Sequence, residues 1–269
     1  MPDPAIFERF AVLVATSGHP ALRPSALAEL GLLVAAGVGQ PIDVAEQLAR
    51  FDPLAEQVGA TDLDGLRRSL FGPGGFRGDG ATYGAVDNSL LDRVLDRRMG
   101  IPITLSMVAI EVGRRVGIPL VGVGMPGHFL LRDAVDEDRF VDPFDRGASL
   151  DREGARALFG RHHGPAIRFD PSYLDPSPPA TVIARVLANL ANACRAADDH
   201  RRLEPVARFR TLLPGADARA FEQHGMALQR TGAFDRAADA LHEAAEREPR
   251  QEEADQLRDR ARSIRASLN

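Results

Sequence analysis

The sequence predicts an α+β fold in which a mostly helical N-terminal part and a small antiparallel sheet precede an all-helical tail. Two changes in the spacing of apolar residues lead to this prediction. Apolar residues recur at helical spacing up to about residue 70, and short period-two runs first appear after residue 117. From about residue 180 helical spacing returns and continues along the tail.

Composition narrows the class of protein. The 269 residues are 44% hydrophobic and 26% charged, as in a globular protein of one large or two smaller domains. The net charge is −5 and the arginines are scattered, so neither nucleic acid nor an anionic membrane is an expected partner. A single cysteine, Cys194, and the lack of a leader pattern or a long apolar run predict a soluble cytoplasmic protein.

The first 71 residues are expected to form four helices. They are placed at about 6–14, at 24–37, at 42–50, and at 62–71 with Thr61 or Asp62 as the N-cap. Residues 72–84 contain six glycines and one proline, which predicts a loop.

The middle of the chain alternates between helix and strand signals. Asp87 or Asn88 is expected to cap a helix over 89–98, and Pro102 stands in the first turn of a helix that ends near Val116. Three period-two runs follow, at 120–123, 128–132 and 139–142. The last two are separated by a short acidic turn, which predicts an antiparallel hairpin.

Four prolines within residues 170–179 predict a linker, assigned to 171–180, between an N-terminal part (1–170) and a tail (181–269). Nine positions of the tail follow the spacing of a tetratricopeptide repeat: Phe221, Gly225, Leu228, Gly232, Phe234, Ala237, Leu241, Ala244 and Pro249. Pro214 lies 35 residues before Pro249, close to the repeat length, so a degenerate first repeat and a capping helix over 251–267 are expected. An alanine-rich helical hairpin is the alternative. So short a tail is expected to pack on the preceding domain.

Three stretches resemble the SirB-type bacterial proteins, which are transglutaminase-like domains followed by tetratricopeptide repeats. They are residues 91–106, the Gly-Ile-Pro to Gly-His-Phe-Leu-Leu-Arg run of 117–132, and Val-Asp-Pro-Phe at 141–144. The resemblance covers roughly residues 45–250. It implies a transglutaminase- or papain-like core, one helix with a small antiparallel sheet, at about 85–170.

The resemblance also implies where a catalytic site would lie. An active core opens its helix with a cysteine, whose thiol pKa is lowered at the helix N-terminus. The spacing of Gly100 and Gly117 puts Pro102 at that position, and proline offers neither a nucleophile nor an N–H. Ser106 is the nearby hydroxyl on the same helix face. His128 stands at the position of the general base and Asp142 at that of the carboxylate that orients it.

Three interpretations of this site stay open. His128 and Asp142 form a buried structural hydrogen bond, or they belong to an inactive site that still binds a peptide, or Ser106 acts as a nucleophile with them. We predict a non-catalytic protein- or peptide-binding regulatory module. The alternative is a hydrolase or acyltransferase on amides that uses Ser106, His128 and Asp142. No cofactor and no metal is expected.

Two further motifs are set aside. Residues 122–127 match Gly-x-Gly-x-x-Gly, but a dinucleotide site needs a helix at the third glycine and here a strand is expected. The pair His162-His163 has no accompanying cysteine and is expected in an exposed loop rather than in a metal site.

Overall fold

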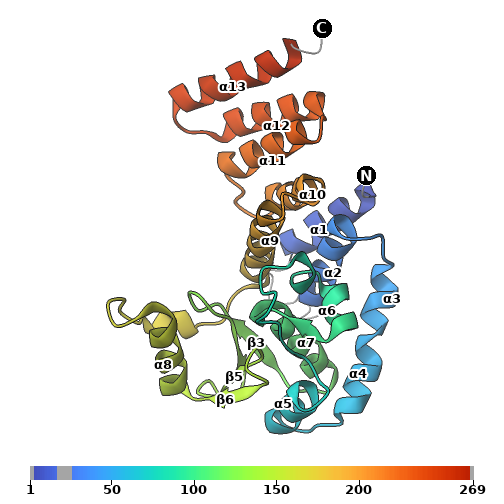
Figure 1. Cartoon of the computed structure of the whole chain (residues 1–269), viewed down its shortest axis with the longest axis vertical. Helices are drawn as coiled ribbons and strands as arrows, with labels where there is room; N and C mark the ends of the chain where they lie inside the picture. The colour runs from blue at the N-terminus through green and yellow to red at the C-terminus, as the bar shows by residue number, and fades with distance from the viewer. Residues whose placement is uncertain (1–2, 17–25, 267–269) are drawn as a thin grey trace.

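The computed structural model describes residues 3–16 and 26–266, and within them the α+β prediction is confirmed. Helices surround a four-stranded sheet, and the last helices extend away from this body (Figure 1). Among the described residues, no helix combines the length and the apolar composition that crossing a bilayer requires.

The N-terminal part consists of five helices: α1 (Pro4–Thr16), α2 (Ala26–Val38), α3 (Val44–Ala49), α4 (Phe51–Val58) and α5 (Leu63–Phe71). Glu29 is the one residue of α2 that is not buried, so this helix is the centre of the main core. The expected start of α2 at residues 24–25 lies outside the described residues. Asp62 caps α5 as expected, through its carboxylate and the N–H of Gly65. Helix α4 was not expected, and Pro53 stands in its first turn, where the missing N–H costs no helical hydrogen bond.

The glycine-rich segment is a loop, as expected, with one short strand. This strand, β1 (Arg77–Gly78), pairs in parallel with β2 (Met99–Gly100). A 3-10 turn over Val86–Asn88 then leads into α6 (Leu91–Arg97). The prediction that Asp87 or Asn88 caps this helix is wrong, because Leu90 is the N-cap and contributes no side-chain hydrogen bond.

Helix α7 (Pro102–Arg115) begins with Pro102 at its first position and is buried from there to Gly113. The sheet that follows has the strand order β3-β4-β5-β6 with every pair antiparallel, and its members are β3 (Leu120–Val123), β4 (Leu130–Asp133), β5 (Phe140–Asp142) and β6 (Ala148–Leu150). The expected hairpin is β4–β5. Strand β4 begins two residues after His128, and β6 was not expected.

Helices cover the sheet on both sides. Helix α7 contacts β3 and β4, with Phe129 and Ile110 packed where Gly122 leaves room for them. Helix α8 (Arg152–His163) forms a second core with the sheet through Phe140, Leu158 and Phe159. This sandwich holds the ends of β4 and β5 rigidly in place.

The tail contains α9 (Pro179–Ala196), α10 (His200–Thr211), α11 (Ala218–Arg230), α12 (Phe234–Arg247) and α13 (Gln251–Ala266). Helices α9 and α10 belong to the main core, where Phe209 packs 4.6 Å from Phe7 between ring centroids. The last helices have a small core of their own and project from the body (Figure 1). Residue 267 of the expected capping helix lies outside the described residues.

The proline-rich segment before α9 is bound to the sheet. Ser177 donates its N–H to the carbonyl oxygen of Gly122 at 2.8 Å, and its hydroxyl oxygen accepts the N–H of Gly124 at 2.9 Å. The segment therefore continues the edge of β3, and α9 begins at a fixed point beside the sheet.

Candidate functional site

His128 and Asp142 lie together, as the sequence analysis expected. His128 precedes β4, Asp142 ends β5, and Nε2 of the imidazole lies 2.9 Å from Oδ2 of the carboxylate. Both residues are buried, with 7% and 5% of their surfaces exposed. The other carboxylate oxygen, Oδ1, accepts the N–H groups of Phe144 at 3.0 Å and Asp145 at 3.3 Å. Asp142 is thus held by the turn after β5 and in turn holds the imidazole.

The Asp142 bond assigns the roles of the two imidazole nitrogens. Nε2 carries the proton that the carboxylate accepts, so Nδ1 of the neutral imidazole is an acceptor. Nδ1 forms no hydrogen bond with any residue that the structure describes. His128 therefore has the hydrogen-bonding arrangement of a general base, and its second nitrogen is not engaged by the described residues.

Ser106 does not join this pair. Its side chain on α7 is fully buried, with 0% exposed, and Oγ has no hydrogen-bond partner within the described part of the chain. Thr104 bonds elsewhere, donating to the carbonyl oxygen of Asn88 at 2.8 Å. Ser106 is buried because α7 is covered on all sides, so a side chain one turn after the start of this helix lies in the core. The structure brings together two of the three predicted site residues and leaves the third apart.

No alternative nucleophile stands at the start of α7. Pro102 occupies the first position of this helix, where a reactive side chain would need to be. The thiol of Cys194 is fully buried in α9, and burial raises its pKa to about 11. It lies about 14 Å along α9 from Arg185, whose guanidinium donates to the His128 carbonyl oxygen at 3.1 Å. Cys194 is neither placed nor ionised for chemistry at His128.

Four side chains that the sequence analysis missed surround His128. Phe144 meets the imidazole edge to face, with centroids 6.4 Å apart, and His162 stacks on it at 5.2 Å. Tyr83 packs on Phe144 at 5.7 Å between ring centroids. Arg185 lies above the Phe129 ring. His128 thus has aromatic side chains and one cationic side chain around it. They come from four separate segments, so no local motif signals them.

The expectation of an exposed loop at His162-His163 is wrong in part. His162 is exposed, but both residues belong to the last turn of α8. His163 is tied to the loop before His128, with Nε2 placed 2.9 Å from the carbonyl oxygen of Pro126. Desolvation of the His162 ring, which stacks on His128, lowers the pKa of His162, and repulsion between the two rings when both are protonated lowers it further, so the neutral form of His162 is favoured.

Burial also acts on the other two polar neighbours. It lowers the pKa of Arg185, whose guanidinium donates hydrogen bonds to the carbonyl oxygens of Met125 and His128 rather than to a carboxylate. It raises the pKa of Tyr83, so the phenol stays protonated and can donate a hydrogen bond. Beside the engaged Asp142, the site thus presents one cation and one hydroxyl donor.

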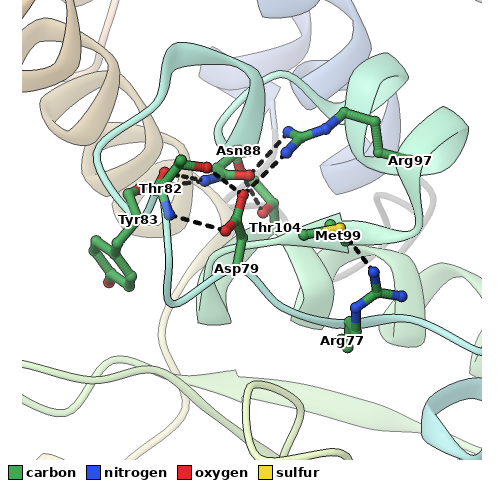
Figure 2. Close-up of polar contacts among 8 residues, drawn as sticks. All are labelled: Arg77, Asp79, Thr82, Tyr83, Asn88, Arg97, Met99 and Thr104. Atoms are coloured by element: carbon green, nitrogen blue, oxygen red, sulfur yellow. Dashed lines mark hydrogen bonds and ion pairs between the residues drawn. The ribbon is translucent and has the colours of Figure 1, made fainter.

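The loop that carries Tyr83 is fixed by a buried cluster around Asp79 (Figure 2). Asp79 is 2% exposed and accepts the N–H and the hydroxyl of Thr82 at 3.0 and 2.6 Å, and the guanidinium of Arg97 at 2.9 Å. Asn88 donates to the Thr82 carbonyl oxygen at 2.6 Å and accepts from Arg97 at 3.0 Å. The Thr82 bonds lower the pKa of Asp79 to about 2, so the carboxylate is ionised at neutral pH.

This cluster determines where Tyr83 lies. The Tyr83 ring points out of the cluster (Figure 2), toward Phe144. The Phe144 ring in turn covers the backbone of Gly78, where a Cβ atom would overlap it. The loop thus forms one wall of the His128 site.

Within the described residues, no group of three or more His, Cys, Asp or Glu side chains is arranged to hold a metal ion.

The sequence comparisons agree with this architecture. The chain is similar to a UPF0162 protein of Xylella fastidiosa (38% identity over 62% of this chain and 61% of the relative) and to UPF0162 protein PA3419 of Pseudomonas aeruginosa (35% over 66% and 68%). It thus spans about three fifths of the length of the Xylella relative. The human F-box only protein 21 is 33% identical over 37% of this chain and 17% of its own length.

No solved structure matches the chain. The sequence profile of the transglutaminase-like superfamily matches residues 38–188, more than half of the chain. The match contains α7, the sheet, and both members of the His128–Asp142 pair. The chain belongs to the transglutaminase-like superfamily.

Proposed function

We propose that this chain is a non-catalytic member of the superfamily that binds a protein or peptide segment and acts as a regulatory module. One observation carries the proposal: His128 and Asp142 are paired at 2.9 Å, but within the described residues neither a serine hydroxyl nor the cysteine thiol forms a hydrogen bond with this pair. Pro102 occupies the start of α7, and the hydroxyl of Ser106 is buried without a partner in the described residues. A base without a nucleophile performs no covalent acyl transfer.

The side chains around His128 support a binding role. A purely structural pair needs only the Nε2 bond, whereas Nδ1 is left as an acceptor that can receive an N–H group from a peptide. Tyr83 is 49% exposed and adds an aromatic surface with a hydroxyl donor. Rigid aromatic side chains of this kind are frequent anchors in binding sites.

The tail supports a binding role as well. We assign α9–α13 to tetratricopeptide-like helical pairs. A Cβ atom at Gly225 would crowd Leu241 and the Ala237 carbonyl oxygen, as expected where two helices of a repeat approach closely. Pro249 follows the end of α12, at the place where the repeat spacing puts it. Stacked helical pairs present extended surfaces to peptides.

We further assign the protein to the cytoplasm, because its single cysteine is buried and unpaired.

The test is a search for turnover. The purified protein is incubated with a glutamine-containing peptide and a fluorescent primary amine, and separately with a fluorophosphonate probe that labels reactive serines. We expect neither amine incorporation, peptide hydrolysis nor labelling above the level of heat-denatured protein. Turnover that disappears in His128→Ala, or labelling that disappears in Ser106→Ala, would overturn the proposal and favour the amide hydrolase or acyltransferase.

A further inference from the structure

A hollow of about 250 Å³ lies between α9, α10 and α11, away from the His128 site. We call it the arginine hollow and define it by its lining residues, which are Ala191, Arg195, Leu203, Ala207, Arg210, Gln223, Met226, Ala227 and Arg230. Each helix contributes one alanine and, three or four positions later, one arginine. This spacing puts both residues on the same face of their helix.

The floor of the hollow is apolar. The three alanines are almost fully buried, so their small side chains leave the space open. Met226 forms a wall and is 41% exposed, although a methionine side chain is apolar enough to favour burial. An apolar side chain that enters the hollow would cover Met226 without displacing charged groups from the floor.

The arginines that line the hollow have no direct ion pair with a described residue. Arg195 bonds the side chain of Asn192 and Arg210 that of Gln223, while Arg230 contacts Nε2 of His200, an atom that also lies 3.2 Å from the Asp198 carboxylate. Among the described residues, none of the three has a carboxylate within ion-pair distance. Other arginines of the tail are paired, as Arg247 is with Glu243 and Arg258 with Asp255.

The charges also act on one another. Burial and then the positive charge of Arg195 lower the pKa of Arg210, and the nearby Asp217 carboxylate opposes this only in part, so the two guanidinium groups are close enough to repel. An anion placed between them would relieve this repulsion and could accept hydrogen bonds from both planar donor groups. The hollow therefore favours additional negative charge above an apolar floor.

We propose that the arginine hollow binds an acidic peptide segment that carries an apolar side chain next to its carboxylates. This deepens the proposed binding function, on which it rests, by naming a second site and its ligand class. The volume of about 250 Å³ is just below the range of about 300–1,000 Å³ of small-molecule pockets and is large enough to admit an apolar side chain. No lining residue is aromatic, so the hollow lacks the platforms on which nucleic-acid bases stack.

The experiment selects ligands without presupposing a partner. A phage-displayed library of random peptides is panned on the full-length protein, and selected peptides are measured by fluorescence polarisation at low and high salt. We expect enrichment of peptides that combine Asp or Glu with Leu, Ile or Met, and binding that weakens as salt rises. Amidated and free C-termini of each peptide distinguish side-chain carboxylates from a terminal one.

Matched variants locate the binding. The triple variant Arg195→Gln, Arg210→Gln and Arg230→Gln is expected to weaken binding roughly tenfold or more. The control, Arg258→Gln, Arg262→Gln and Arg265→Gln on the outer helix α13, removes the same charge and is expected to bind within about twofold of wild type, because its site is untouched. If the first triple variant unfolds, the single variants at the exposed Arg195 and Arg230 replace it.

Several results would overturn the proposal. They are the absence of enriched peptides, enrichment of neutral or basic ones, equal losses in the two triple variants, or a single-stranded oligonucleotide that binds through the same arginines more tightly than the peptides. Turnover in the acyl-transfer assay would refute the proposed non-catalytic function without contradicting ligand binding in the arginine hollow. If the protein shows no turnover and the selection yields no peptide, only the proposal for the arginine hollow is refuted.

Discussion

Replacing Asp79 with asparagine is expected to remove a pH-dependent part of the stability of this protein. The carboxylate of Asp79 is buried and its pKa is lowered from 3.8 to about 2 by its bonds to Thr82. A lowered pKa in the folded state means that folding is favoured by the ionised form. The stabilisation is therefore fully present above pH 3.8 and is lost as the pH falls through about 2.

The magnitude follows from the two pKa values. A difference between 3.8 and about 2 corresponds to about 2.4 kcal/mol of unfolding free energy at neutral pH. The same linkage relation removes about 1 kcal/mol of this by pH 3. Because asparagine cannot ionise, Asp79→Asn should be about 2 kcal/mol less stable than wild type at pH 6, with the difference about 1 kcal/mol smaller at pH 3.

The assay is urea unfolding followed by circular dichroism at these two pH values, since the chain has no tryptophan for fluorescence. With a slope of about 3 kcal/mol per molar urea, a change of 1 kcal/mol moves the midpoint by about 0.3 M. The control is Asp87→Asn, which removes the same charge from the same loop at an exposed side chain without hydrogen bonds to the described residues. A wild-type minus Asp79→Asn difference that is equal at pH 6 and pH 3 would refute the reasoning.

Three further predictions concern packing and burial. Gly78→Ala places a Cβ atom against the Phe144 ring and should lower the unfolding free energy by about 1–3 kcal/mol in the same urea assay; an unchanged midpoint would contradict that contact. The thiol of Cys194 should react with a chromogenic disulfide only after unfolding, because it is buried and its pKa is about 11; rapid reaction of the native protein would contradict this. Ser106→Ala removes a buried hydroxyl that has no partner in the described residues, so stability should be unchanged or rise by up to about 1 kcal/mol, and a loss above 1 kcal/mol would point to an undetected partner.

The sequence predicted the parts of the fold that depend on local pattern. Pro102 marked the start of α7, and the period-two runs marked the antiparallel hairpin of β4 and β5. The His128–Asp142 pairing could be expected from the resemblance together with this hairpin, because an antiparallel hairpin places the start of β4 next to the end of β5. Helix α4 and strand β6 were missed because short elements carry few apolar positions.

The rest of the site depends on contacts that no local pattern records. His162 and Arg185 contact His128 from the end of α8 and the side of α9, and Tyr83 packs on Phe144 from a loop. The position of Ser106 could be assigned to a helix face, but its burial could not be judged. Helix α7 is covered all round, so a polar residue there gives no sign of which side meets solvent.

Helix α9 connects the two proposed binding regions. Arg185 bonds the carbonyl oxygen of His128, and Arg195 on the same helix lines the arginine hollow. Ten residues of helix separate them by about 15 Å along the axis and by about 80° around it. An extended segment of about five residues covers that length, but it would have to wind around α9 to reach both sites. Two separate contacts on one ligand, joined by a segment free to turn, fit this geometry better than one continuous groove, and such paired contacts raise affinity through effective concentration.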